Sequence, residues 1–342
     1  MNAPPPKLKI KNESKIQRYQ APFQTSAVLE LVLASMLWGF GFIATAWTLR
    51  AIGPIALTAI RMSFGFIFGF LVCAALPSLR RQLAWDQLLL AFWPGIFLSA
   101  TMVLQTWGLQ YTTVTKSGFI TTLYVLFVPL LERALLGRRI PKYHMFYVFG
   151  ALIGVALICD LPQLFRSSLS SVPGLLPGSV QTSIVIDPRT VWNLGDWITL
   201  GCAIAASLQI VWFGKIQKDI RSSFVFNTFQ TFWAALIPFF LMFIFEVVPT
   251  KLTGLPLWGM LELIFGSTMI AFSLQVRAQK KISPSVSSLI FLLESPFAAI
   301  FGFLVLKEIP SVQTLVGGVI ILAALISSVV FSNEGTSNVV VE

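Results

Sequence analysis

Two charged side chains lie inside stretches of the sequence that are otherwise apolar. Glu294 comes ten residues after Pro284, and Arg61 lies six residues inside an earlier apolar run. If both runs form membrane helices, a rise of about 1.5 Å per residue places Glu294 about 15 Å and Arg61 about 9 Å deep. A charge at such a depth is costly unless it is paired, hydrated or, for a carboxyl, protonated. The chemistry that these residues offer is therefore the binding of a charged ligand or of a proton.

Each of the two charges also has a purely structural interpretation. Arg61 is close enough to one membrane face for its guanidinium to reach the lipid headgroups. A protonated Glu294 could instead form a hydrogen bond between helices. The functional alternative is a cavity in which Arg61 binds an anionic group of a substrate and Glu294 binds an amine or a proton.

Four uncharged polar residues complete the predicted site. Gln230 falls in the second half of the chain at the place that corresponds to Arg61, so the two are expected to flank one central cavity. Trp38 lies deeper in its apolar run than most other Trp residues, and Gln105 and Gln209 are amides within such runs. Side-chain amides often only join neighbouring helices, which is the alternative role for them. The predicted substrate-binding residues are Arg61, Glu294, Gln230, Trp38, Gln105 and Gln209.

The composition indicates that most of the chain is in contact with lipid. Of its 342 residues, 56% are hydrophobic and 11% are charged, whereas soluble domains carry about 25% charged residues. A soluble globule, a disordered chain and a secreted disulfide scaffold are all excluded by these values. The 24 Lys and Arg residues lie in short segments between apolar runs. That pattern is typical of membrane topology rather than of a nucleic-acid-binding surface.

Few residues are available for catalysis or for metal binding. The chain has one His, which excludes histidine metal motifs, and each of its three Cys residues lies inside an apolar run. A Cys in such a place usually packs as a small hydrophobic residue. The sequence also contains no GxxxxGK[ST] phosphate-binding motif. We therefore expect no catalytic residue, no bound metal and no cofactor.

Ten apolar runs are long enough to cross a bilayer, which takes about 20 residues in a helix. Gly, Pro and charged residues separate these runs. The sequence therefore predicts an all-α membrane protein with ten transmembrane helices. The predicted spans are residues 27–47, 55–76, 87–108, 117–136, 143–162, 196–214, 223–248, 256–275, 284–305 and 311–331.

The distribution of Lys and Arg predicts the orientation of the spans. With the N-terminus inside, 17 of the 24 basic residues fall in inside segments, six fall outside, and Arg61 lies within a span. Because basic residues gather on the cytoplasmic side, both termini are expected in the cytoplasm, as tails over residues 1–26 and 332–342. The Ser-, Pro- and Gly-rich segment 163–195 is then an external loop. A lid over the site is a second role that such a loop could have.

The predicted loop separates two halves that resemble each other. Pro129 and Pro296 are 167 positions apart, and so are Gly150 and Gly317. Since each half has an odd number of spans, the halves are expected to be inverted relative to each other in the membrane. Inverted repeats are typical of secondary transporters, whose substrate site lies near the middle of the membrane between the repeats. The two predicted five-helix repeats are residues 27–162 and 196–331.

Short motifs in both halves point to a known family. The first half contains Trp38-Gly39, Pro54 followed by Arg61, and Gly108-Leu109-Gln110-Tyr111-Thr112 leading to Pro129 and Gly150. The second half contains Glu294-Ser295-Pro296, Lys307-Glu308, Gln313 and Gly317-Gly318. On these residues the chain resembles the bacterial EamA type of the drug/metabolite transporter superfamily, over residues 28–160 and 195–330. Two features depart from that pattern: residues 137–141 lack a Glu that such units often carry, and the external loop is longer than usual.

The resemblance implies a permease in the cell inner membrane that moves a small organic metabolite by alternating access. Amino acids and related compounds are the favoured substrates, export is favoured by the habit of the family, and protons are the candidate coupling ion. The expected partners are therefore a metabolite, the lipid bilayer and protons, without nucleic acid. A non-transporting membrane receptor or assembly partner is one alternative. An intramembrane enzyme is a weaker one, because a single His and no paired intramembrane Asp leave little for catalysis.

Overall fold

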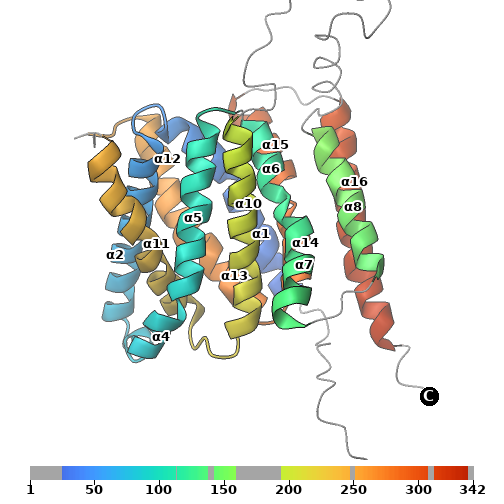
Figure 1. The fold of residues 1–342 in the computed structure, drawn as a ribbon, viewed down its shortest axis with the longest axis horizontal. Helices are drawn as coiled ribbons and strands as arrows, with labels where there is room; N and C mark the ends of the chain where they lie inside the picture. The colour runs from blue at the N-terminus through green and yellow to red at the C-terminus, as the bar shows by residue number, and fades with distance from the viewer. Residues whose placement is uncertain are drawn as a thin grey trace, which may run out of the picture.

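The computed structural model describes residues 25–112, 114–137, 142–158, 194–246, 251–306 and 312–337, which form helices, turns and short connections without a strand (Figure 1). The predicted external loop lies outside these residues except for its last two positions, 194 and 195. Residues 1–24 and 338–342 of the two predicted tails also lie outside them, as do Lys307-Glu308 and most of the segment 137–141.

Four long uninterrupted helices are α1 (Thr25–Thr48), α2 (Pro54–Ala75), α10 (Leu194–Ile216) and α11 (Ser223–Phe245). Pro54 occupies the first turn of α2, where a missing N–H costs nothing. Ser222 caps α11, because its side chain accepts a hydrogen bond from the backbone N–H of Val225. Within the described residues, these four helices and the segments Leu255–Gln279 and Pro284–Val305 are long and apolar enough to cross a membrane.

Three of the predicted spans are each divided into two shorter helices. Their bounds are α4 (Trp85–Leu90) and α5 (Phe92–Leu109), α6 (Val114–Thr122) and α7 (Tyr124–Leu136), and α14 (Pro284–Phe291) and α15 (Glu294–Leu306). Prolines explain the first and the last of these breaks, because proline has no N–H to donate to the carbonyl four residues earlier. Pro94 leaves the carbonyl of Leu90 without that donor, and Pro296 does the same to Leu292.

The predicted span 256–275 contains a segment with a wider helical turn. Here α12 (Leu255–Glu262) continues into the π-helix η1 (Leu263–Ala271) and then into α13 (Phe272–Gln279). Hydrogen bonds in a π-helix join residues five apart, and such segments are frequent at functional sites. The side chain of Thr268 follows the same spacing, since its Oγ1 donates to the carbonyl oxygen of Leu263 at 2.7 Å.

The remaining helices are α3 (Pro77–Arg80), α8 (Lys142–Ile158) and α16 (Val312–Ser337). The C-terminal tail predicted from residue 332 therefore begins within a helix rather than after it. Figure 1 shows α8 and α16 as a pair at one side of the bundle. In the rest of the bundle the two halves interleave: α10 packs on α5, α11 packs on α2 and α5, and α1 packs against α12, η1, α13 and α15.

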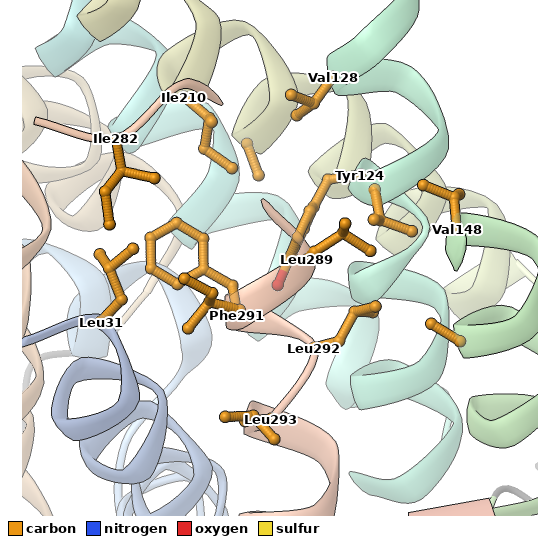
Figure 2. Close-up of a cluster of buried hydrophobic side chains, with 14 of the residues drawn as sticks. Leu31, Tyr124, Val128, Val148, Ile210, Ile282, Leu289, Phe291, Leu292 and Leu293 are labelled. Carbon is orange, nitrogen blue, oxygen red and sulfur yellow. The ribbon is translucent and has the colours of Figure 1, made fainter. Parts of the chain in front are cut away.

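Buried apolar side chains from several helices converge on the break between α14 and α15. Leu31 from α1, Tyr124 from α7, Ile210 from α10 and Phe291 from α14 belong to this cluster (Figure 2). Each of these side chains is at most 5% exposed. The break is therefore held in the centre of the bundle by contacts from both halves.

Two acidic side chains join the halves at helix starts. Glu246, which follows α11, accepts hydrogen bonds from the backbone N–H groups of Ile55 (3.0 Å) and Ala56 (2.8 Å) in the first turn of α2. Glu132 in α7 accepts from the backbone N–H (3.1 Å) and the hydroxyl of Ser285 in the first turn of α14. A carboxylate in such a place satisfies unpaired N–H groups and interacts favourably with the helix dipole.

The pairing of α8 with α16 depends on one glycine. A methyl group on Gly154 would lie 2.6 Å from the carbonyl oxygen of Gly317, whereas a methyl group on Gly150 would meet only the Cβ of Ala324, at 3.9 Å. We therefore expect Gly154→Ala to lower the free energy of unfolding by about 1–3 kcal/mol, as overpacking does. Gly150→Ala is the matched control and should be neutral or slightly stabilising. Thermal unfolding of the purified chain in detergent measures both, and equal midpoints would contradict the close contact.

Candidate functional site

A cavity lies inside the bundle, between helices of both halves. The centres of water molecules can occupy about 70 Å³ of it, which is room for several waters at roughly 10–15 Å³ each. Its wall is formed by α1, α2, α5, α6, α7, α10, η1, α13, α14 and α15. Aromatic rings, side-chain amides, hydroxyl groups and two charged side chains face one another across it. A wall of this kind suits a small molecule that has both polar and apolar parts.

Arg61 is the cation of the cavity wall. It lies in α2 and is only 4% exposed. Its Nε donates a hydrogen bond to Oγ1 of Thr268 in η1, at 2.6 Å. Glu262 acts on it electrostatically, but Arg61 forms no ion pair with any residue that the structure describes. Thr268 thus anchors one side of the guanidinium, and the two terminal nitrogens of Arg61 form no hydrogen bond with a described residue.

Glu294 is the acid of the cavity wall. It is the first residue of α15, directly after the break at Leu292 and Leu293, and it is 7% exposed. Across the described part of the chain its carboxyl group has neither a hydrogen bond nor an ion pair. The start of a helix favours a negative charge through the helix dipole. Arg61 and Glu294 therefore share one cavity without neutralising each other.

Trp38 forms the aromatic part of the wall on α1. Its ring centroid lies 5.0 Å from that of Phe272 and 5.1 Å from that of Phe291. Its Nε1–H donates to the carbonyl oxygen of Ser267 in η1, at 3.2 Å. The indole is therefore fixed by both packing and a hydrogen bond, as expected for a ring that shapes a binding surface.

Two of the three predicted amides line the cavity, and the third lies behind it. Gln105 and Gln209 are wall residues, and Nε2 of Gln105 lies 3.4 Å from Oγ1 of Thr121. Gln230 is fully buried and is not among the lining residues. Its Oε1 accepts a hydrogen bond from Nε2 of Gln209 at 3.3 Å. The structure thus brings five of the six predicted residues to one cavity and connects Gln230 to it through Gln209.

Sequence reasoning did not select Tyr124, a polar residue of the wall to which another unpartnered polar group, Gln275, also belongs. The hydroxyl oxygen of Tyr124 and Oε1 of Gln275 are both buried without a hydrogen-bond partner in the described residues. Figure 2 shows the hydroxyl of Tyr124 directed towards the chain around Phe291. A signal for Tyr124 was present in the sequence: like Glu294, it is a polar residue shortly before a proline in an apolar run. Gln275 does stand out in the sequence, as an amide at the end of the apolar run 256–275.

Metal chemistry has little support in the part of the chain that the structure describes. No group of three or more His, Cys, Asp and Glu side chains there could hold a metal ion. The two cysteines within it, Cys73 and Cys202, are buried and free. The polar groups of the cavity are therefore suited to binding an organic ligand rather than a metal.

Comparisons with known proteins agree on one family. Residues 25–159 and 193–330 each match the sequence profile of the EamA-like transporter family. An uncharacterized transporter of Archaeoglobus fulgidus is 27% identical over 303 residues, which cover 88% of this chain and 84% of that protein. The uncharacterized transporter YoaV of Bacillus subtilis is 20% identical, over 87% of this chain and 94% of its own. A protein of known crystal structure, 18% identical, superposes with a TM-score of 0.68 over 91% of this chain and 99% of its own.

The geometry of the amides predicts different chemical accessibility for two of them. In a variant whose three native cysteines are replaced by alanine, Gln105→Cys should react rapidly with a charged methanethiosulfonate reagent, because Gln105 lines the cavity. Gln230→Cys should react much more slowly, because Gln230 is fully buried behind Gln209. Reaction rates measured by mass spectrometry on the protein in membranes decide this. Comparable rates would contradict the position of Gln230 outside the cavity.

Proposed function

Because the chain belongs to the EamA-like transporter family, we propose that it is a secondary transporter for a small zwitterionic metabolite, with amino acids and closely related compounds as the favoured substrates. Its family and relatives indicate a membrane transporter and not an enzyme. The observation that carries the proposal is that Arg61 and Glu294 line a single cavity and that neither forms an ion pair with a residue that the structure describes.

The two charges support a zwitterionic ligand because neither forms an ion pair within the described residues, although Glu262 acts on Arg61 electrostatically. A charge in a poorly hydrated interior is costly unless an opposite charge or several hydrogen bonds replace its hydration. A substrate carboxylate could accept two parallel hydrogen bonds from the terminal nitrogens of Arg61. A substrate ammonium could in turn donate to the carboxylate of Glu294. One ligand would thereby satisfy both ends of the cavity.

The rest of the wall supports a ligand that also has an apolar part. Trp38, Phe42, Phe272 and Phe291 contribute aromatic surface. Such surface favours burial of a hydrocarbon or aromatic side chain, at about 25 cal/mol for each Å² removed from water. Gln105 and Gln275 add hydrogen-bonding groups that can select among side chains.

Alternating access is the mechanism that this arrangement supports. The cavity lies between helices of both repeats, and helix breaks before Tyr124 and before Glu294 border it. In our proposal the ten spans form two inverted repeats in the inner membrane, with both termini cytoplasmic, and rocking of the repeats exposes the cavity to each side in turn. Glu294 would bind the substrate ammonium and a proton alternately, and transport would run in the direction of export.

The role of Arg61 can be measured in proteoliposomes that contain the purified chain and are screened with labelled amino acids. For any amino acid that is transported, Arg61→Ala should raise the apparent KM by about 10- to 100-fold, the loss expected for hydrogen bonds to a charged group. Arg61→Lys should recover little of this, because the forked contact is lost. Arg50→Ala, which removes an exposed arginine, is the matched control. An unchanged KM in Arg61→Ala would show that Arg61 only stabilises the fold.

The role of Glu294 can be separated from a structural one by two substitutions. Glu294→Gln should keep the fold but abolish net transport or its dependence on pH between about pH 5.5 and 8, because the amide cannot bind or release a proton. Glu294→Leu should also lose any hydrogen bond between helices, which is worth about 1 kcal/mol in lipid. Uptake rates across this pH range provide the measurement. Equal rates and equal pH profiles in wild type and Glu294→Gln would make Glu294 a structural residue.

A further inference from the structure

Three buried side-chain amides, joined by hydrogen bonds, form a row from the cavity to η1. Nε2 of Gln209 donates to Oε1 of Gln230 at 3.3 Å, and Nε2 of Gln230 donates to Oδ1 of Asn227 at 2.9 Å. Gln230 and Asn227 are both 0% exposed and lie in α11. All the hydrogen bonds point the same way, so each amide is polarised in the same direction by the next. Asn227 is the last of the three amides.

Asn227 donates to the backbone of the π-helix. Its Nδ2 lies 2.9 Å from the carbonyl oxygen of Thr268, 3.3 Å from that of Met269 and 3.2 Å from Oγ of Ser273. A single side chain on α11 thus contacts two consecutive carbonyl groups of η1. Because the wide turn is an unusual backbone conformation, contacts of this kind can determine which conformation the segment keeps.

Thr268 connects this backbone to the cation of the cavity. Its carbonyl oxygen accepts from Asn227, and its Oγ1 accepts from Nε of Arg61 at 2.6 Å while donating to the carbonyl of Leu263 at 2.7 Å. The position of Arg61 therefore depends on the position of Thr268, and that position is held by Asn227. Neither Asn227 nor Thr268 lines the cavity.

We infer that Asn227 is a positioning residue that holds η1 in the conformation in which Thr268 directs the terminal nitrogens of Arg61 into the cavity. The inference deepens the proposed function, on which it rests for the role of Arg61 as the site of the substrate's anionic group. The same amides also orient Gln209: one N–H of its NH2 group donates to Gln230, which leaves its carbonyl oxygen to accept a hydrogen bond from a substrate ammonium.

Glu262 is an alternative partner for the guanidinium of Arg61 when the contacts of Asn227 and Thr268 are lost. It acts on Arg61 electrostatically, its carboxylate lies near the hydroxyl of Ser267, and both of its oxygens are buried without a hydrogen bond of normal geometry among the described residues. A guanidinium released from Thr268 is therefore expected to turn from the cavity towards Glu262, where an ion pair satisfies both groups. The conformation of η1 then decides between a substrate-binding and a self-neutralised Arg61.

The test measures the position of Arg61 without requiring a known substrate. Phenylglyoxal, which modifies the terminal nitrogens of arginine, is applied to the full chain in lipid nanodiscs, and the rate at each arginine is followed by mass spectrometry. Arg221 and Arg277, whose side chains are 52% and 57% exposed, are internal references for folding and reagent. Thr231→Val is the matched control, because Thr231 is buried in the same helix and its hydroxyl, among the described residues, bonds to carbonyl groups of that helix.

Asn227→Ala should slow modification of Arg61 by about tenfold relative to the two reference arginines, as expected for one buried hydrogen-bonded group lost. Thr268→Val should have the same effect, and Thr268→Ser, which keeps the hydroxyl, should stay near the wild-type rate. Adding Glu262→Gln to Asn227→Ala should restore the rate, because the competing carboxylate is gone. If Asn227→Ala fails to fold, the rates of Thr268→Val and Thr268→Ser provide the same comparison.

Two results would overturn the inference. One is a wild-type rate at Arg61 in Asn227→Ala or Thr268→Val, with the reference arginines unchanged. The other is an Arg61 that does not react in the wild-type chain, because its terminal nitrogens would then not face the cavity. Failure of the proposed function would give a different result. Proteoliposomes with the wild-type protein would then transport no zwitterion, while the reaction rate of Arg61 with phenylglyoxal could still depend on Asn227.

Discussion

The cost of an uncompensated charge in a poorly hydrated interior is the constraint on which the rest of this structure depends. Arg61 and Glu294 are each more than nine-tenths buried, face one cavity and form no ion pair within the described residues. Such groups are stable only if water, a ligand or, for the carboxyl, a bound proton offsets the lost hydration. The helix breaks, the π-helix and the row of three amides can all be understood as the means that hold these two charges apart. A ligand with both charges would complete the arrangement.

The fold keeps the two charges apart by interleaving its two repeats. Glu246 links the end of α11 to the start of α2, which carries Arg61, and Glu132 links α7 to the start of α14, which leads to Glu294. Each charged residue is therefore positioned by a helix of the other repeat. A relative movement of the repeats would change the distance between the charges, which is how binding and rocking could be coupled in the proposed mechanism.

The sequence indicated site residues where the type of a residue differed from that of its apolar neighbours. Arg61 and Glu294 stood out as charges in apolar runs, and Trp38 as an aromatic residue deep in one, and all three line the cavity. Gln230 does not line it, because depth in a helix says nothing about which face a side chain occupies. The π-helix could not be foreseen, because its wide turn is fixed by contacts such as Asn227 with Thr268, which are 41 positions apart. Pro296 indicated a disturbed helix beside Glu294, but the sequence did not show that this break borders the cavity.

The central claim is that a single ligand satisfies both charges, and thermal unfolding of the purified chain tests it most directly. Each amino acid of a panel is compared with its amine analogue without the carboxyl group and with its acid analogue without the amine. The account predicts that at least one amino acid raises the unfolding temperature more than both of its analogues, and that Arg61→Ala abolishes the difference. Equal stabilisation by the single-charge analogues, or no stabilisation by any zwitterion in the panel, would contradict it.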